Sequence, residues 1–422
     1  MKKILLLGSS PAAINAVEII KSQIECEIVF LPLSDHLVVD KQRYIEMIDK
    51  QLRTKQIYYR PKDFYEKTNI KIINDKKVTR VNLSRKKVHF EDRSQLDFDV
   101  IILSDTPDHR QGDLKGSNKS GVFGFKNIND IEQISTLAAL NSTITIEGDQ
   151  WWTVELAMLM ANKNKEIILS VSANYPLIHG TSDEYKQWIV QTLKSKGIQL
   201  LIDNPIVEIL GESDLKAIKV RSGKVYAADL VILENTYLDT RVFNEAIEIG
   251  DAAVVVDEHY KSNLEDVYAV DFAAQRSQEL WNSYGPRNEF LEYQSHILAA
   301  SVLKKEETYD LPIPTFFVSQ ENFSLTSIGQ VVERRNVQSV MKTDSTDGRL
   351  IKLFEKDGLF IGIIALNVNV VPHDVIERIR NKSEINSIKE HFFSLMAPLV
   401  QVSSEYSSAG ELEKAYEQTN SA

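Results

Sequence analysis

The chain opens with a short apolar run, a helical pattern and a second apolar run. Residues 4–7 are all apolar and are closed by Gly8, residues 13–22 place apolar side chains at helical spacing, and residues 27–31 form the second run. Two buried strands joined by a turn and a helix are the βαβ unit of doubly wound parallel sheets. The pattern therefore predicts such a unit at the start of the chain. Further helices are predicted at about 43–54, starting at residues 60–65, and near 182–196.

The same pattern recurs in the middle of the chain. Residues 143–146 predict a strand closed by Gly148, followed by a helix from about 153 to 162 and a strand at 166–171. In both halves, further short strands follow the βαβ unit. They are predicted at 70–73, 78–82, 87–91 and 99–103 in the first half, and at 198–202, 206–210, 217–220 and 230–233 in the second. The repeat indicates two similar units, the second nested inside the first.

The pattern changes from about residue 312. Residues 315–318, 350–355 and 359–366 predict antiparallel strands, and helices are expected near 374–380 and 384–396. The predicted fold class is therefore α/β, with two nested Rossmann-like three-layer domains and a C-terminal α+β domain. The last residues are rich in Ser and Glu, which predicts a flexible tail.

Composition and charge narrow the class of protein. A net charge of −11 among 422 residues argues against nucleic acid as the partner, because phosphate backbones are bound by clustered Lys and Arg. No apolar stretch reaches the ~20 residues that span a bilayer, so no membrane span is expected. The single cysteine excludes an internal disulfide framework, and the eight histidines lack metal-ligand spacing. These features predict a cytoplasmic protein without a metal site.

Several segments, in their order and spacing, resemble one known superfamily. The flavin turn of that superfamily corresponds to residues 4–13, and later blocks correspond to residues 60–67, 98–103, 228–233, 256–270 and 358–362. The chain resembles the pyridine nucleotide–disulfide oxidoreductases, in particular rubredoxin reductase, the flavoprotein part of nitrite reductase and coenzyme A disulfide reductase. The resemblance implies an FAD-type domain, an NAD(P)-type domain inserted in it and a C-terminal interface domain. The expected boundaries are 1–107 with 244–308, then 108–243, 309–400 and a flexible tail at 401–422.

The resemblance also identifies the positions that should hold cofactors. A dinucleotide pyrophosphate binds at a helix N-terminus, and the turn before it carries Gly-x-Gly-x-x-Gly or Ala. The matching positions are Gly8, Ser10, Pro11, Ala13, Thr106 and Asp271 for FAD, and Gly148 and Glu155 for NAD(P)H.

The flavin positions depart from the pattern of the superfamily. Ser10 places a side chain where the pyrophosphate should pass, and Pro32 stands where an acid should bind ribose hydroxyls. Ala-Thr-Gly is replaced by residues 104–106. The late Gly-Asp is replaced by Asp271-Phe272, although a slip of one residue in the alignment would restore Asp271 as the aspartate.

The nicotinamide positions depart further. Gly148 remains, but Gln150 and Thr153 replace the second and third glycines, and Trp151-Trp152 adds bulk. Asp149 adds negative charge beside the phosphate position. Val171 stands at the position that recognises ribose. Glu155 matches a glutamate of the family, and a plain helix carboxylate near the positive end of the dipole is an equal alternative.

No catalytic residue is predicted. Cys26 lies at the entrance of the second strand and is interpreted as a packed cysteine. His36 is expected to be a satisfied surface histidine, although a place near the flavin crevice is the alternative. The cluster of Asp105, Asp108 and His109 is given no catalytic role.

Three hypotheses for function stay open. The first is a pseudoenzyme that has lost tight binding of FAD and NAD(P)H and acts as a structural or regulatory partner, because all the losses fall on the two ligands while the core patterns persist. The second is an active NAD(P)H-dependent FAD oxidoreductase that passes electrons to a small carrier or small molecule. The third is a binder of a different ligand, with the tryptophan pair as a stacking platform. In each case the resemblance implies a homodimer, or a heterodimer with an intact relative, through the C-terminal domain.

Overall fold

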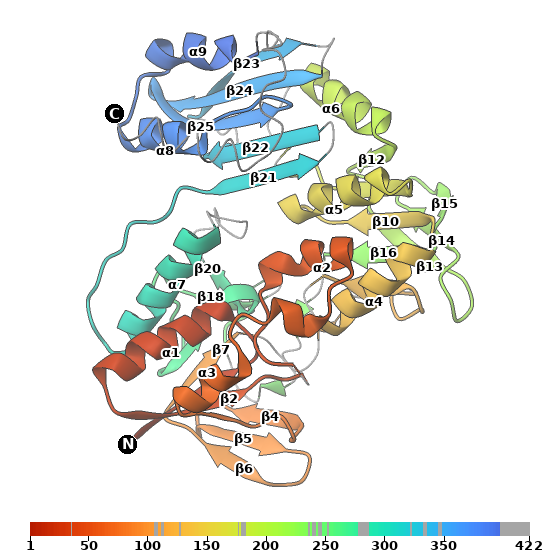
Figure 1. Ribbon diagram of the computed structural model, residues 1–422. Coiled ribbons are helices and arrows are strands. Elements are labelled where there is room, and N and C mark those ends of the chain that lie inside the picture. Colours follow the sequence, from red (N-terminus) through yellow and green to blue (C-terminus); the bar gives the residue numbers. More distant parts are fainter. Residues whose placement is uncertain are drawn as a thin grey trace.

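In its described part, the computed structural model is built around three five-stranded sheets, with helices packed around them (Figure 1). It describes residues 1–34, 36–104, 109–110, 114–125, 128–175, 177–178, 183–234, 237–238, 242–243, 247–250, 253–276, 287–320, 323–331, 336–344 and 348–396. The predicted tail at 401–422 lies outside these residues.

The first sheet is parallel and has the strand order β19-β7-β1-β2-β3. Its central strands are apolar runs that are buried on both faces, as expected for a parallel sheet covered by helices. Helices α1 and α7 pack against each other (Figure 1). The bounds are β1 Lys2–Leu7, α1 Pro11–Gln23, β2 Cys26–Leu31, β3 Ile70–Ile72, β7 Val100–Leu103, β19 Val267–Ala269 and α7 Arg287–Val302.

The second sheet repeats this plan with the order β12-β11-β10-β16-β9, again parallel. In sequence it lies wholly between β7 and β19 of the first sheet, so the nested arrangement predicted from the repeat is confirmed. The bounds are β9 Val122–Gly124, α4 Ile128–Leu140, β10 Thr143–Glu147, α5 Trp151–Asn162, β11 Glu166–Val171, α6 Asp183–Ser195, β12 Ile198–Ile202 and β16 Leu230–Leu233. The domain boundaries themselves stay a prediction.

Each parallel sheet is accompanied by a three-stranded antiparallel meander. The first comprises β4 Val78–Asn82, β5 Lys87–Phe90 and β6 Gln95–Asp97, and the second β13 Ile206–Leu210, β14 Ala217–Val220 and β15 Val225–Ala227. Small pairs are formed by β8 His109–Arg110 with β17 Tyr237–Leu238, and by β18 Val254–Val256 with β20 Ala274–Arg276.

The C-terminal sheet is antiparallel, as predicted, with the order β21-β22-β25-β24-β23. One face forms a core with α8 and α9, and the other joins the core around α5. The bounds are β21 Thr315–Gln320, β22 Phe323–Gly329, β23 Gln338–Asp344, β24 Arg349–Lys356, β25 Leu359–Leu366, α8 Pro372–Arg380 and α9 Ile385–Ser394.

The helices differ in part from the sequence prediction. The helix expected at 43–54 is broken into a 3-10 turn at Lys41–Arg43, helix α2 at Tyr44–Lys50 and a 3-10 turn at Thr54–Ile57. Gln51 has a φ of 51° and ends α2, because a left-handed residue cannot continue a right-handed helix. Helix α3, at Lys62–Lys67, begins directly after Pro61 as predicted. Helices α4 and α7 were not predicted.

Candidate functional site

The first candidate turn lies at the carboxyl end of β1. Gly8 has a φ of +93°, and its N–H donates to the carbonyl of Leu31 over 2.8 Å. Ser10 is the N-cap of α1, and its hydroxyl accepts from the Ala13 N–H over 3.3 Å, with Pro11 in the first helical position. The structure therefore brings together four predicted flavin positions. A short neutral side chain satisfies one of the amides on which a pyrophosphate would rest.

Two serines and Asp271 lie near the same edge of the first sheet. The Ser9 hydroxyl is buried and has no hydrogen-bond partner among the described residues. Ser104 follows β7, and both its N–H (2.8 Å) and its hydroxyl (3.2 Å) donate to the Leu7 carbonyl. Asp271 has a φ of 59°, a conformation that glycine favours and aspartate tolerates. This favours the alignment in which Asp271 replaces the glycine of the family. Thr106 lies outside the described residues, as do Asp105 and Asp108.

The end of β2 provides no acidic side chain at the predicted ribose position. Pro32 is buried directly after the strand, and Leu33 has a φ of 60°. The His36 ring lies 3.4 Å from the Tyr58 hydroxyl and 3.7 Å from the Glu132 carboxylate. These contacts match the expected satisfied histidine.

The second candidate turn lies at the carboxyl end of β10 and is closed by a carboxylate. Glu234 follows β16, and its Oε2 accepts from the backbone N–H of Gln150 over 3.1 Å and from that of Asp149. A Cβ placed on Gly148 would lie 2.2 Å from that oxygen and 2.4 Å from the Glu234 Cβ. Gly148 thus makes room for the Glu234 side chain. Glu234 was not among the predicted residues, since it lies far from the turn in sequence.

Two more carboxylates use backbone donors at this edge. Asp149, predicted to charge the phosphate position, instead accepts from the Ser172 N–H over 2.7 Å. Glu147 accepts from the Ile206 N–H (2.6 Å) and the Ser170 hydroxyl (2.9 Å). Burial raises the pKa of Glu147, Asp149 adds to this effect, and the two hydrogen bonds oppose it. At this edge of the second sheet, several backbone amides therefore donate to carboxylates of the chain itself.

The tryptophan pair is part of the core. Trp151 and Trp152 are 4% and 6% exposed. The Trp152 ring stacks on Phe125 with centroids 3.9 Å apart and planes 6° apart, while Trp151 stacks on Phe316 of β21 at 4.9 Å. These rings tie α5 to the C-terminal sheet and to the segment before α4. Their burial disfavours the stacking-platform hypothesis.

Glu155 is the one residue of 151–160 that is not buried. It lies one turn into α5, past the two tryptophans. Glu155 therefore lies on the helix that follows the Gly148 turn, and it is outside the core.

The residues present fit the two cofactors unequally. The first turn keeps a left-handed glycine and an unsatisfied hydroxyl at Ser9, and the Ser10 hydroxyl that caps its helix is neutral. An FAD pyrophosphate could replace the Ser10 cap. The second turn does not fit NAD(P)H, because a carboxylate already holds its amides and aromatic rings pack the start of α5.

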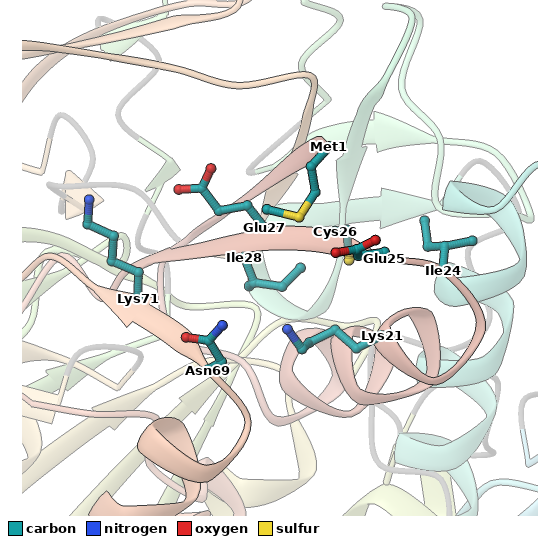
Figure 2. Close-up of a pocket in the computed structure, with 9 residues that line it drawn as sticks. All are labelled: Met1, Lys21, Ile24, Glu25, Cys26, Glu27, Ile28, Asn69 and Lys71. Atoms are coloured by element: carbon teal, nitrogen blue, oxygen red, sulfur yellow. The ribbon is translucent and has the colours of Figure 1, made fainter.

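A cavity of about 360 Å³ lies away from both turns, near the beginning of β2 (Figure 2). Its lining includes Lys21, Cys26, Asn69 and Lys71, and none of the predicted cofactor positions. Cys26 is 6% exposed, and burial raises the pKa of its thiol, although Lys21 and Lys2 lower it. A packed, protonated thiol agrees with the sequence interpretation of Cys26.

The described residues contain neither a metal-binding cluster nor a membrane-spanning helix. No group of three or more His, Cys, Asp or Glu side chains there is arranged to hold a metal ion. None of the helices in that part of the chain is both long and apolar enough to cross a membrane.

Two parallel sheets, each with a glycine turn leading into a helix, define the class of proteins built from two dinucleotide-binding units. The family model described as pyridine nucleotide-disulphide oxidoreductase matches residues 2–283, which is more than half of the chain. The chain belongs to this family.

Comparisons with individual proteins agree with this family. The chain is 20% identical over 402 residues to human apoptosis-inducing factor 3, covering 93% of this chain but only 65% of that protein. It is 19% identical over 356 residues to the NADH-rubredoxin oxidoreductase of Clostridium acetobutylicum, covering 84% of this chain and 88% of that one. A crystal structure of the covalent putidaredoxin reductase–putidaredoxin complex matches with a TM-score of 0.75 at 16% identity, covering 94% of this chain and 99% of that one. At this identity the structural match shows the fold alone.

Proposed function

We propose that this oxidoreductase-fold protein has lost NAD(P)H-dependent catalysis and acts as a structural or regulatory partner. The observation that carries the proposal is the Glu234 carboxylate on the amides of Asp149 and Gln150. A turn at a helix N-terminus can bind an incoming anion only through donors that are available, and here two of them, the amides of Asp149 and Gln150, already hold a carboxylate.

Electrostatics supports the same proposal. A pyrophosphate at this turn would approach Glu234, and it would also lie on the edge that carries Glu147 and Asp149. Two like charges about 4 Å apart repel by about 4 kcal/mol at an effective dielectric constant of about 20. Binding would therefore require Glu234 to leave its two amides.

A second candidate is an active NAD(P)H-dependent FAD oxidoreductase that delivers electrons to a small carrier protein. The names of the relatives favour it, since one is an NADH-rubredoxin oxidoreductase and another was crystallised with putidaredoxin. The first turn favours it as well, because Gly8 and Ser9 retain a geometry that an FAD pyrophosphate could use. This candidate requires the second turn to rearrange.

One experiment separates the two candidates. The purified protein is incubated with excess FAD and desalted, its visible absorbance is recorded, and NADH and NADPH are then titrated. We expect little retained flavin and no saturable reduction by either nucleotide. Flavin at close to one per chain, reduced rapidly by NADH or NADPH, would establish the second candidate and end the first. A rubredoxin reductase carried through the same steps serves as the positive control.

The proposed partner is a second copy of this chain or an intact relative, bound through the C-terminal domain. In this region Phe317 is 45% exposed, Val371 52% and Leu395 37%. An interface through this domain would cover these exposed apolar side chains. Light scattering coupled to size exclusion, with Val371→Asp as the variant, tests whether the chain self-associates there.

A further inference from the structure

The two parallel sheets place one pair of residues in the same structural position. Ser104 follows β7 in the first sheet, and its N–H donates to the carbonyl of Leu7, the last residue of β1. Glu234 follows β16 in the second sheet, and its N–H donates to the carbonyl of Glu147, the last residue of β10. Both hydrogen bonds are 2.8 Å long. The backbone at Ser104 and Glu234 is therefore equivalent relative to the adjacent glycine turn.

The side chains at these two positions act differently. The Ser104 hydroxyl is short and returns to the Leu7 carbonyl. The Glu234 side chain is long enough to reach the turn, where its Oε2 accepts from two consecutive amides before α5. Those amides stand at the positive end of a 12-residue helix, which favours a negative group.

The Glu234 side chain also fills the space beside Gly148. Its carboxylate and Cβ occupy the space in which a side chain at Gly148 would lie, at 2.2 Å and 2.4 Å from an added Cβ. The Gly148 N–H is itself held by the Ser170 carbonyl at 3.0 Å, so the turn is fixed on both sides.

We propose that Glu234 is a built-in ligand of the α5 N-terminus, and that its removal uncovers a binding site for a phosphate group. This inference rests on the proposed function, in which the second turn takes no nucleotide. Glu234 is then the residue that decides whether this turn accepts an external anion, and serine, the residue at the equivalent position of the first sheet, is the replacement that should open it.

The test compares the natural chain with Glu234→Ser and with Glu212→Ser, a control at an exposed glutamate. Inorganic pyrophosphate, then ADP and NADH, are titrated at constant ionic strength by calorimetry. We expect saturable pyrophosphate binding in Glu234→Ser that is at least about tenfold tighter than in the other two proteins. A folded Glu234→Ser protein that gains no affinity overturns the inference and leaves the proposed function intact. A natural chain that already binds NADH or pyrophosphate as tightly as the variant overturns both.

A second measurement does not depend on affinity. Hydrogen exchange by mass spectrometry is followed in peptides that contain Asp149 and Gln150. We expect faster exchange of these amides in Glu234→Ser, slowed again by pyrophosphate, with no change in Glu212→Ser. If Glu234→Ser does not fold, Glu234→Gln, which keeps an acceptor oxygen but no charge, is measured instead. Unchanged exchange in a folded variant means that Glu234 does not hold the turn.

Discussion

The two glycine turns of this chain share a backbone arrangement. They differ in the side chain that accepts from the backbone amides next to the following helix. At the first turn, Ser10 caps α1 with a neutral hydroxyl, and the first helical residues are Pro11 and Ala12. At the second turn, the Glu234 carboxylate accepts from the amides of Asp149 and Gln150 just before α5, and the first helical residues are Trp151 and Trp152. The first helix thus begins with small side chains, whereas the second begins with two aromatic rings packed in the core.

On the proposed function, this difference indicates how a nucleotide-binding fold could stay stable with no nucleotide at its second turn. The unpaired amides at a helix N-terminus need an acceptor, and burying them without one is costly. An internal carboxylate satisfies the amides at the second turn, and aromatic packing stabilises the helix that follows. The first turn has only a weak neutral cap and keeps an unsatisfied hydroxyl at Ser9. The second turn is therefore the one whose backbone donors are more fully satisfied by the chain itself.

The largest effect on stability is expected from removing an aromatic ring at the start of α5, directly after the second turn. Trp152→Ala should lower the free energy of unfolding by about 3–5 kcal/mol, because it deletes a buried ring stacked on Phe125. Urea unfolding measures the change. Leu140→Ala, at a side chain that is 75% exposed, is the control and should change stability by less than about 0.5 kcal/mol. Equal effects of the two variants would contradict the core role of Trp152.

The two glycines should respond to alanine for different reasons. Gly148→Ala should destabilise the protein by about 1–3 kcal/mol, because the new methyl group meets Glu234. Gly8→Ala should cost about 1–2 kcal/mol through its positive φ. Adding Glu234→Gly should relieve part of the Gly148→Ala penalty and none of the Gly8→Ala penalty. A double-mutant cycle measures this coupling, and strict additivity at both sites would argue against the contact.

The cap of the first turn should contribute less. Ser10→Ala removes the acceptor of the Ala13 N–H and should lower stability by about 1 kcal/mol. The matched control is Ser213→Ala at an exposed loop position. Chemical denaturation compares the two, and a stability gain in Ser10→Ala would mean that the hydroxyl does not act as the cap. Because the cap occupies an amide that a pyrophosphate would use, retention of FAD by the same variant can be measured alongside.

The smallest effect concerns pH. Burial raises the pKa of Glu147 above its ordinary value of 4.5, so the folded protein holds this proton more tightly than the unfolded chain. The stability from this group is fully present below pH 4.5 and falls as the pH rises through the folded-state pKa. The amide oxygen of the Glu147→Gln variant can still accept from the Ile206 N–H. This variant should therefore lack the part of the decline in stability with pH that comes from Glu147. Unfolding midpoints of both proteins across this pH range provide the measurement, and parallel curves would assign the decline to other groups.

Some features of the site could be predicted from the sequence because they are local. The strand, turn and helix around Gly8 and around Gly148 follow from apolar periodicity and from glycine after a buried run. Glu234 was missed because its contact joins residues more than eighty positions apart. The repeat did carry a signal, since aligning the two halves places Glu234 opposite Ser104, but only the pairing of β10 with β16 shows that the side chain reaches the turn.

The order of the elements, the nested repeat and the departure from the glycine pattern at both turns could be read from the residues alone, since each of these depends on near neighbours in the chain. The groups that now contact the two turns became visible in the folded arrangement. Parallel strands bring the ends of distant segments to one edge, so the partner of a turn is set by strand order and not by sequence distance. The first turn is capped locally by Ser10, whereas strand order brings a distant glutamate to the second.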